Sequence, residues 1–329
     1  MNKRVWVYLV IAMWVSAVAA QPKRPVTIPK QGVKTPGVLI PFAGLKAEAE
    51  FPKAPAWVAF TDAALIADEH GLFRIDAKKN ELGAAVAALN KPCGGAASGF
   101  GSLWVPSCGD QTLVRIDPKT WKITATVASG AGTAAQSVAA NPDSIWLLSD
   151  NRTTLSRIDT EQNLVVAELR LPAGCNTLTF GESALWVTCP SEDRVLRIDP
   201  QTNLVDQRIE VSAQPKALAI SEGSIWVLCQ KDGKLERIDP KTNKVIKTIE
   251  LGVSGAEGSI AAGQGSIWVS LTGFPVTRID PQTDKVVQQF WGTGGGVIRF
   301  GLGSVWLSNL QEGTLWRLDP KRIAATLAE

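Results

Sequence analysis

The chain has 329 residues, of which 45% are hydrophobic and 20% charged, and its 34 basic and 31 acidic residues give a formal net charge of +3. This balance is typical of a globular protein. A charge so near neutrality, without a basic cluster, gives no electrostatic argument for nucleic-acid binding. The 29 Gly and 19 Pro residues and the scarcity of helix-favouring runs indicate many turns and short strands.

Residues 1–20 have the three parts of a secretory signal peptide. Lys3 and Arg4 precede an apolar run from Val5 to Val15, and small residues follow as far as Ala20. The run is too short to span a bilayer, and no Cys follows it to carry a lipid anchor. We therefore expect cleavage after Ala19 or Ala20, export to the periplasm or the extracellular space, and no membrane span in the mature chain. Cleavage leaves 32 basic and 31 acidic residues, a net charge of +1.

Residues 21–44 contain five prolines and several basic residues without helical or strand periodicity. This composition predicts an extended Pro-rich linker. The folded domain is then expected over residues 45–329.

A repeat of about 40 residues fills this domain. A motif such as GSIWV is followed, ten or eleven residues after its Trp, by the Arg of R-[IL]-D. The Trp residues are Trp104, Trp146, Trp186, Trp226, Trp268 and Trp306, and the Arg residues are Arg115, Arg157, Arg197, Arg237, Arg278 and Arg317. A seventh, degenerate copy carries Arg74, with Ile66 expected at the Trp position.

Each repeat holds four short apolar or alternating segments separated by turn-forming residues. Forty-residue units of four strands are typical of propeller blades. The sequence therefore predicts an all-β fold, a seven-bladed β-propeller of four-stranded antiparallel blades. We assign the repeated residues to folding: the Trp is expected to pack against a neighbouring blade, the Arg to reach a carboxylate or carbonyl, and the Asp to accept hydrogen bonds from turn amides.

The pattern G-S-I-W-V followed by R-I-D-P-x-T resembles the YVTN-type family of propeller repeats and the related streptogramin B (virginiamycin B) lyase-like propellers. The resemblance covers roughly residues 45–329. It is specific for the fold and weak for activity.

The ring is expected to close through its N-terminal segment. Leu45–Phe51 alternates between apolar and charged residues and matches the last strands of other repeats. We expect it to pair with the third strand of the seventh blade, around Leu315–Leu318. The C-terminal segment, Arg322–Ala328, is the alternative closing strand.

Candidate binding residues are polar side chains that break the repeat on the loops at one end of the blades, near the central channel. Function tends to lie on loops held by a rigid scaffold. The candidates are His70, Asp150, Arg152, Asn176, Lys216, Gln230, Glu257, Arg299 and Asn309. We expect Asp150, Asn176, Glu257 and Arg299 nearest the axis. Arg299 stands out because the first strands of the other repeats carry Ala or Thr at its position.

The cysteines recur at equivalent blade positions, which places Cys93 beside Cys108 and Cys175 beside Cys189. Export makes two disulfides plausible, each closing a loop of about 15 residues. Cys229 is left over, as a buried thiol or a reactive group on the loop face. The spacing does not fit a zinc site.

We expect a ligand-binding or protein-binding module, a monomer, whose partner is a protein, peptide, glycan or small molecule. The alternative is a metal-dependent lyase or hydrolase. The resemblance to the lyases implies a divalent metal and a His/Glu constellation, yet His70 is the only His of the chain. A gluconolactonase-like calcium site would have to use Asp150, Asn176 and Glu257. No cofactor is evident from the sequence, and the identity of any metal stays open.

Overall fold

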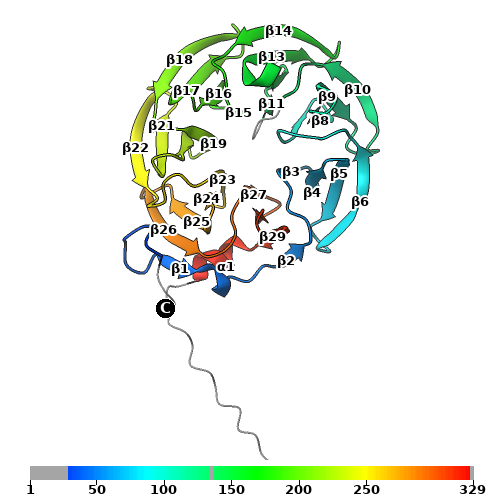
Figure 1. The fold of residues 1–329 in the computed structure, drawn as a ribbon. Helices are drawn as coiled ribbons and strands as arrows, with labels where there is room; N and C mark the ends of the chain where they lie inside the picture. The colour runs from blue at the N-terminus through cyan, green and yellow to red at the C-terminus, as the bar shows by residue number, and fades with distance from the viewer. Residues whose placement is uncertain (1–28, 133–136, 327–329) are drawn as a thin grey trace, which may run out of the picture. The chain divides into compact units, whose positions relative to one another are not determined.

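The computed structural model describes residues 29–132 and 137–326, and the part from Gln31 onward forms a ring of seven antiparallel blades (Figure 1). The first strands of neighbouring blades contact one another around the axis, and the fourth strands form the outer wall. The predicted seven-bladed propeller is thereby confirmed. The predicted signal peptide lies outside the described residues.

Each blade from the first to the sixth is built from four strands that are consecutive in the sequence. Blade 1 has β3 (Val58–Phe60), β4 (Ala64–Asp68), β5 (Gly71–Asp76) and β6 (Glu81–Ala88). Blade 2 has β7 (Ala97–Gly99), β8 (Ser102–Ser107), β9 (Thr112–Ile116) and β10 (Ile123–Ala128). Blade 3 has β11 (Val138–Ala140), β12 (Ile145–Ser149), β13 (Thr154–Asp159) and β14 (Leu164–Arg170). Blade 4 has β15 (Thr177–Gly181), β16 (Ala184–Cys189), β17 (Arg194–Asp199) and β18 (Leu204–Glu210).

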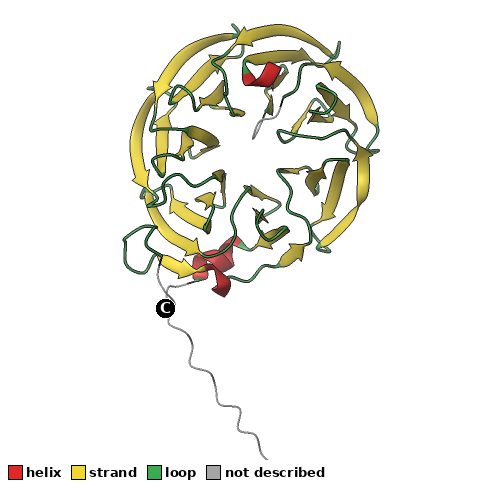
Figure 2. Cartoon of the chain, in the orientation of Figure 1, coloured by secondary structure: helices red, strands yellow, loops and turns green. Residues whose placement is uncertain are grey.

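The remaining blades include the two strands that come from the N-terminal part. Blade 5 has β19 (Pro215–Ser221), β20 (Ser224–Cys229), β21 (Lys234–Asp239) and β22 (Lys244–Glu250). Blade 6 has β23 (Gly258–Gly263), β24 (Ser266–Leu271), β25 (Phe274–Asp280) and β26 (Lys285–Trp291), with β1 (Leu39–Pro41) added at its edge. Blade 7 has β27 (Ile298–Gly301), β28 (Ser304–Asn309) and β29 (Thr314–Leu318), with β2 (Ala49–Phe51) as its outer strand. Helix is confined to η1 (Phe42–Gly44), η2 (Asp150–Arg152) and α1 (Pro320–Ala325) within the described residues (Figure 2).

The repeated Trp residues form the core between blades, as predicted. All six are almost completely buried, and each packs against apolar residues of the following blade. The indole N–H of Trp226 donates to the carbonyl of Ser221 (3.3 Å), so its polar atom is satisfied inside the core.

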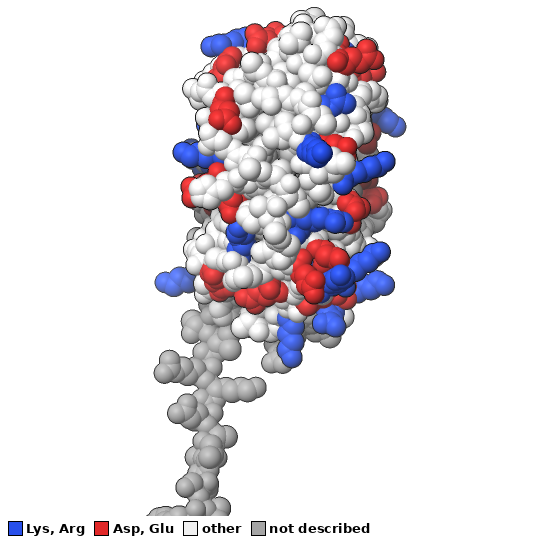
Figure 3. All heavy atoms as spheres, turned by 90° about the vertical axis from the view of Figure 1, so that its right-hand side faces the viewer, with Lys and Arg blue, Asp and Glu red and all other residues white. Residues whose placement is uncertain are grey.

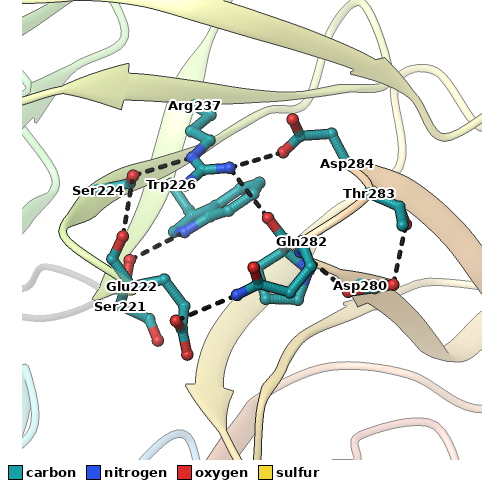
Figure 4. Close-up of polar contacts among 10 residues, drawn as sticks. Ser221, Glu222, Ser224, Trp226, Arg237, Asp280, Gln282, Thr283 and Asp284 are labelled. Carbon is teal, nitrogen blue, oxygen red and sulfur yellow. Dashed lines mark hydrogen bonds and ion pairs between the residues drawn. The ribbon is translucent and has the colours of Figure 1, made fainter.

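Four of the seven repeated Arg residues connect one blade to the next, namely Arg115, Arg157, Arg237 and Arg317. The guanidinium of Arg237 lies over the ring of Trp226 and donates to the hydroxyl of Ser224 (2.9 Å) in its own blade (Figure 4). It also donates to the carbonyl of Pro281 (2.9 Å) and to a carboxylate oxygen of Asp284 (3.0 Å) in blade 6. Both kinds of acceptor that the sequence predicted are therefore present. We call this arrangement the Arg connector.

The repeated Asp residues hold the turns between third and fourth strands, and the turn of Asp280 is the one that receives Arg237. The carboxylate of Asp239 accepts a hydrogen bond from the amide of Lys241 (2.9 Å), and that of Asp280 accepts one from the amide of Gln282 (2.9 Å). These amides favour the ionised carboxylate, so the pKa of each Asp lies below its ordinary value.

The first blade corrects one sequence alignment. Arg74 pairs in register with Leu65, whereas the Arg of each later blade pairs with its Trp. Leu65 therefore occupies the Trp position and packs toward blade 2, while Ile66, which was expected there, packs toward blade 7. The hairpin between β4 and β5 is shorter than in blades 2, 4, 5 and 7, which shifts the register relative to the sequence motif.

The N-terminal segment closes the ring. Ala49, Glu50 and Phe51 pair antiparallel with Arg317, Trp316 and Leu315 of β29, as predicted. The alternative closing strand is wrong in its described part, because residues 320–325 form α1, whose N-terminus is capped by Asp319.

The described part of the expected linker is packed on blade 6. Leu39–Pro41 pairs parallel with β26, and Ile40 and Phe42 are buried in the core between blades 6 and 7. The side chain of Gln289 anchors the preceding turn, since it accepts from the amide of Val33 (2.9 Å) and donates to the carbonyl of Leu251 (3.0 Å). From Gln31 onward the segment thus belongs to the ring.

The surface carries charges of both signs. On the side formed mainly by blades 1 and 2, basic and acidic side chains alternate around a broad uncharged area (Figure 3). On the outer strands β6 and β10 of these blades, Ala84, Ala85 and Ile123 are exposed. Within the described residues, no helix combines the length and the apolar character needed to cross a membrane.

Candidate functional site

Five of the nine residues selected from the sequence line one pocket of about 290 Å³. It lies at the mouth of the channel, on the side that carries the loops between second and third strands. Asn176, Lys216, Gln230, Glu257 and Arg299 contribute to it from blades 4, 5, 6 and 7. We call it the channel-mouth pocket.

The pocket is held together by hydrogen bonds between successive blades. The carbonyl of Lys216 accepts from the side-chain amide of Asn176 (2.9 Å) and from the hydroxyl of Thr177 (2.7 Å). The side-chain amide of Gln230 donates to the carbonyl of Gly258 (3.1 Å) in the next blade. These polar side chains are therefore positioned by backbone groups of a neighbouring blade.

One ion pair lies on the rim. The ammonium of Lys216 is 3.5 Å from a carboxylate oxygen of Glu257, and the two side chains are 36% and 85% exposed. A pair so exposed is weak, because water screens it and side-chain entropy opposes it. A charged ligand can therefore replace either partner of this ion pair with little loss of free energy.

A guanidinium lies deeper in the pocket. Arg299 pairs in register with Trp306 on β27, and its Nη1 donates to the hydroxyl of Ser259 (2.7 Å) and to the carbonyl of Ile298 (2.9 Å). Burial lowers the pKa of Arg299 to about 10, because desolvation disfavours the charged form. The group is still protonated at neutral pH and gives the pocket a positive floor.

The pocket walls are largely apolar and were missed by the sequence search. Leu218, Ile260, Val297 and Leu310 line them beside a glycine-rich loop. Gly295 in this loop has φ of 105°, and a Cβ there would overlap the carbonyl oxygen of Leu271. The run GTGGG at 292–296 is the sequence signal that could have identified this close approach.

The other four candidates do not line the pocket. Arg152 contacts it indirectly, since its Nη1 donates to Oδ1 of Asn176 (3.2 Å), and Asp150 lies exposed beside it in η2. Asn309 is fully buried, and its side-chain oxygen accepts from the amide of Gly295 (3.2 Å). His70 lies on the β4–β5 turn, 83% exposed and next to Glu69.

The pocket does not fit the metal sites considered from the sequence. Among its lining residues Glu257 is the only carboxylate, and no imidazole is present. The oxygen of Asn176 already accepts from Arg152, and Asp150 is not in the lining, so the proposed calcium ligands do not converge. Across residues 29–132 and 137–326, no group of three or more His, Cys, Asp or Glu side chains is placed to hold a metal ion.

Two disulfides brace loops on the same side of the ring. Cys93 is bonded to Cys108 and Cys175 to Cys189, with Cα separations of 5.9 and 4.0 Å. Both predicted pairs are confirmed. Cys229 is free and fully buried, and its register partner is Pro215 in the place of a second Cys. Burial raises the pKa of this thiol, which disfavours the reactive thiolate.

No protein-family model and no curated protein matches the sequence. The ring is similar to a streptogramin B lyase structure, with a TM-score of 0.67 and 17% identity over 81% of this chain and 94% of that chain. It is also similar to virginiamycin B lyase from Staphylococcus aureus, with a TM-score of 0.67 and 16% identity over 82% and 97% of the two chains. A Kuenenia stuttgartiensis hydrazine synthase chain gives a TM-score of 0.58 and 12% identity over 70% and 78%. At these identities the likeness shows the fold alone.

Proposed function

We propose that this propeller is an exported binding module that holds a small anionic ligand, or an acidic side chain of a protein partner, in the channel-mouth pocket. The observation that carries the proposal is the convergence of five repeat-breaking polar residues from four blades on one pocket. Residues that depart from a repeat do not serve the repeat itself, so their convergence favours a site.

The charges of the pocket favour an anion. Lys216 and Arg299 are cationic and Glu257 is the single acid among the lining residues. The guanidinium is partly withdrawn from water, where its attraction for a carboxylate or phosphate is stronger than at the surface. The volume of about 290 Å³ suits a small molecule or one side chain rather than a folded partner.

The proposed export is supported by the two disulfides, because such bonds persist in oxidising compartments. It is supported further by the signal peptide predicted from the first 20 residues.

A lyase function remains the alternative that the similar structures suggest, but the pocket has only one carboxylate and no imidazole for acid–base chemistry. Incubation with quinupristin, with which one virginiamycin B lyase structure was determined, separates the two functions. We expect the compound to keep its chromatographic retention. A change in retention that depends on Glu257 would support the lyase.

The binding function is tested by thermal shift with acetate, succinate, inorganic phosphate and acetamide as probes. We expect an anionic probe to raise Tm of the wild-type protein and acetamide to leave it unchanged. Arg299→Gln and Lys216→Ala should remove the shift, whereas the control His70→Ala should keep it. Shifts that are equal in all three variants would contradict the proposal.

A further inference from the structure

Three blade junctions lack the Arg connector, because Arg74, Arg197 and Arg278 bond acceptors of their own blades. The residue that receives the connector lies in the turn between third and fourth strands, in a left-handed conformation. It is Asn or Asp in five blades, namely Asn80, Asn163, Asn203, Asn243 and Asp284, of which all but Asn243 accept from an Arg, and it is Trp121 in blade 2. Trp has no acceptor atom, so the junction between blades 1 and 2 cannot form this contact.

Arg74 of blade 1 bonds within its own blade. Its Nη2 donates to a carboxylate oxygen of Asp62 (2.9 Å), and its Nε is buried with no hydrogen-bond partner among the described residues. Its side chain is 43% exposed, against 19% for Arg237 and 16% for Arg317, which form connectors. Much of the guanidinium thus faces solvent in a place where the repeat normally buries it.

A cavity of about 800 Å³ opens at this junction. It is lined by the first-to-second and third-to-fourth strand turns, which lie at the opposite end of the blades from the channel-mouth pocket. Its groups include two cations, Arg74 and Lys119, the carboxylate of Asp62, the hydroxyl of Ser98 and the ring of Trp121. The cations exceed the acids by one.

The backbone at Trp121 makes the choice of Trp costly. Its φ is 59°, a region that Asn and Asp tolerate and a bulky side chain rarely occupies. The Trp121 ring is half-buried. It packs against the core cluster that contains Leu65, Val114 and Ile116, and it also borders the cavity. Strained residues of this kind cluster at binding sites.

We propose that this cavity binds a small carboxylate carried on a ring, with the carboxylate at Arg74 and Lys119 and the face of the ring against Trp121. A guanidinium pairs with a carboxylate through two parallel hydrogen bonds. An indole offers a flat apolar surface for the face of a sugar or aromatic ring. The two possible sources are therefore a uronic acid and an aromatic acid.

The test uses the full chain and three probes, D-glucuronate, benzoate and D-glucose, measured by saturation-transfer NMR and calorimetry. We expect glucuronate or benzoate to bind. Glucose should bind at least about tenfold more weakly than the acid, because it lacks the charged contact. The acid that binds identifies the source. No binding of either acid at about 10 mM, or equal binding of glucose, would overturn the proposal.

The matched variants are Trp121→Asn, which restores the repeat, and Arg157→Gln, which removes a connector at a junction without the cavity. Trp121→Asn should abolish binding, and because Asn can receive Arg74 its Tm should not fall. Arg157→Gln should bind like the wild type. Arg74→Gln keeps the test valid if Trp121→Asn fails to fold, and it should lower the affinity for the acid about tenfold. Unchanged binding in Trp121→Asn or Arg74→Gln would overturn the proposal.

Discussion

Nη1 of Arg317 in the last blade donates a hydrogen bond to Oδ1 of Asn80 in the first blade (2.8 Å). The connector that joins blade 5 to blade 6 is thus repeated where the two ends of the chain meet. Arg317 also donates from Nε to Ser304 (2.9 Å) and lies 3.5 Å from Glu48, which precedes the closing strand β2. The closing junction therefore uses the same polar chemistry as an interior one.

The Arg connector should contribute measurably to stability. Arg237→Ala removes bonds to Ser224, Pro281 and Asp284 and should lower the free energy of unfolding by about 1.5–3 kcal/mol, the range for hydrogen bonds to charged groups. Arg197→Ala is the matched control, because Arg197 bonds Asp206 within its own blade and leaves the turn of blade 5 unbridged. Urea unfolding followed by Trp fluorescence measures both. Equal losses would show that the contact between blades adds nothing.

The disulfides should stabilise the ring, and Cys229 should be inert. Replacing Cys175 and Cys189 together by Ala should lower the free energy of unfolding by about 3 kcal/mol, the value for a loop of 14 or 15 residues in the chain-entropy model. Without reductant, a thiol reagent should label Cys229 only after denaturant is added, because the thiol is buried and its pKa is raised. Rapid labelling of the native protein would place Cys229 at an accessible site instead.

Most of the fold could be predicted from the sequence, because the Trp and Arg of each repeat mark two paired strands at a constant spacing. The prediction failed where the spacing changed. In blade 1 a shorter hairpin moves the strand register by one residue, so that Leu65 pairs with Arg74. Alignment to the sequence motif alone placed Ile66 at the Trp position. Strand β1 has three residues and ends in Pro41, which is too short for any periodicity to show.

The candidate site could be predicted only in part. Repeat-breaking polar residues located Lys216, Glu257 and Arg299, because a polar group that serves no repeat contact needs another role. The same search selected Asn309, which is repeat-breaking yet buried and structural. It passed over Trp121, because an aromatic residue in a turn was outside a search for polar residues on one side of the ring.

Stability should fall in acid because of the turn aspartates. The pKa values of Asp76, Asp117, Asp199, Asp239 and Asp280 are lowered, first of all by hydrogen bonds from turn amides. A lowered folded-state pKa gives a contribution that is complete above the unfolded value near 3.8 and is lost as pH falls toward the folded value. Tm should therefore be steady above about pH 5 and decline below about pH 4.

The origin of this decline is tested with Asp239→Asn combined with Asp280→Asn. Asn keeps an acceptor for the turn amides but does not titrate, so the decline of Tm between about pH 5 and pH 3 should be shallower than in the wild type. Asp239→Ala combined with Asp280→Ala should instead lower Tm at neutral pH. A decline with the same slope in the Asn variant would assign the acid sensitivity to other groups.

Ring closure by β2 should be essential, and separable from the contribution of β1. Phe51 is buried and stacks on Trp306 with ring centroids 6.1 Å apart, so Phe51→Ala should lower the free energy of unfolding by about 3–5 kcal/mol. Glu50→Ala, at the exposed neighbouring position, should change it by less than about 0.5 kcal/mol.

A chain starting at Leu45 loses β1 but keeps β2, whereas a chain starting at Pro52 loses both and leaves the edge of β29 unpaired. Unpaired edges template aggregation. We therefore expect Tm to fall modestly for the first chain, and sharply with aggregation on light scattering for the second. If the two shortened chains have the same Tm, the pairing of β2 with β29 does not hold the ring closed.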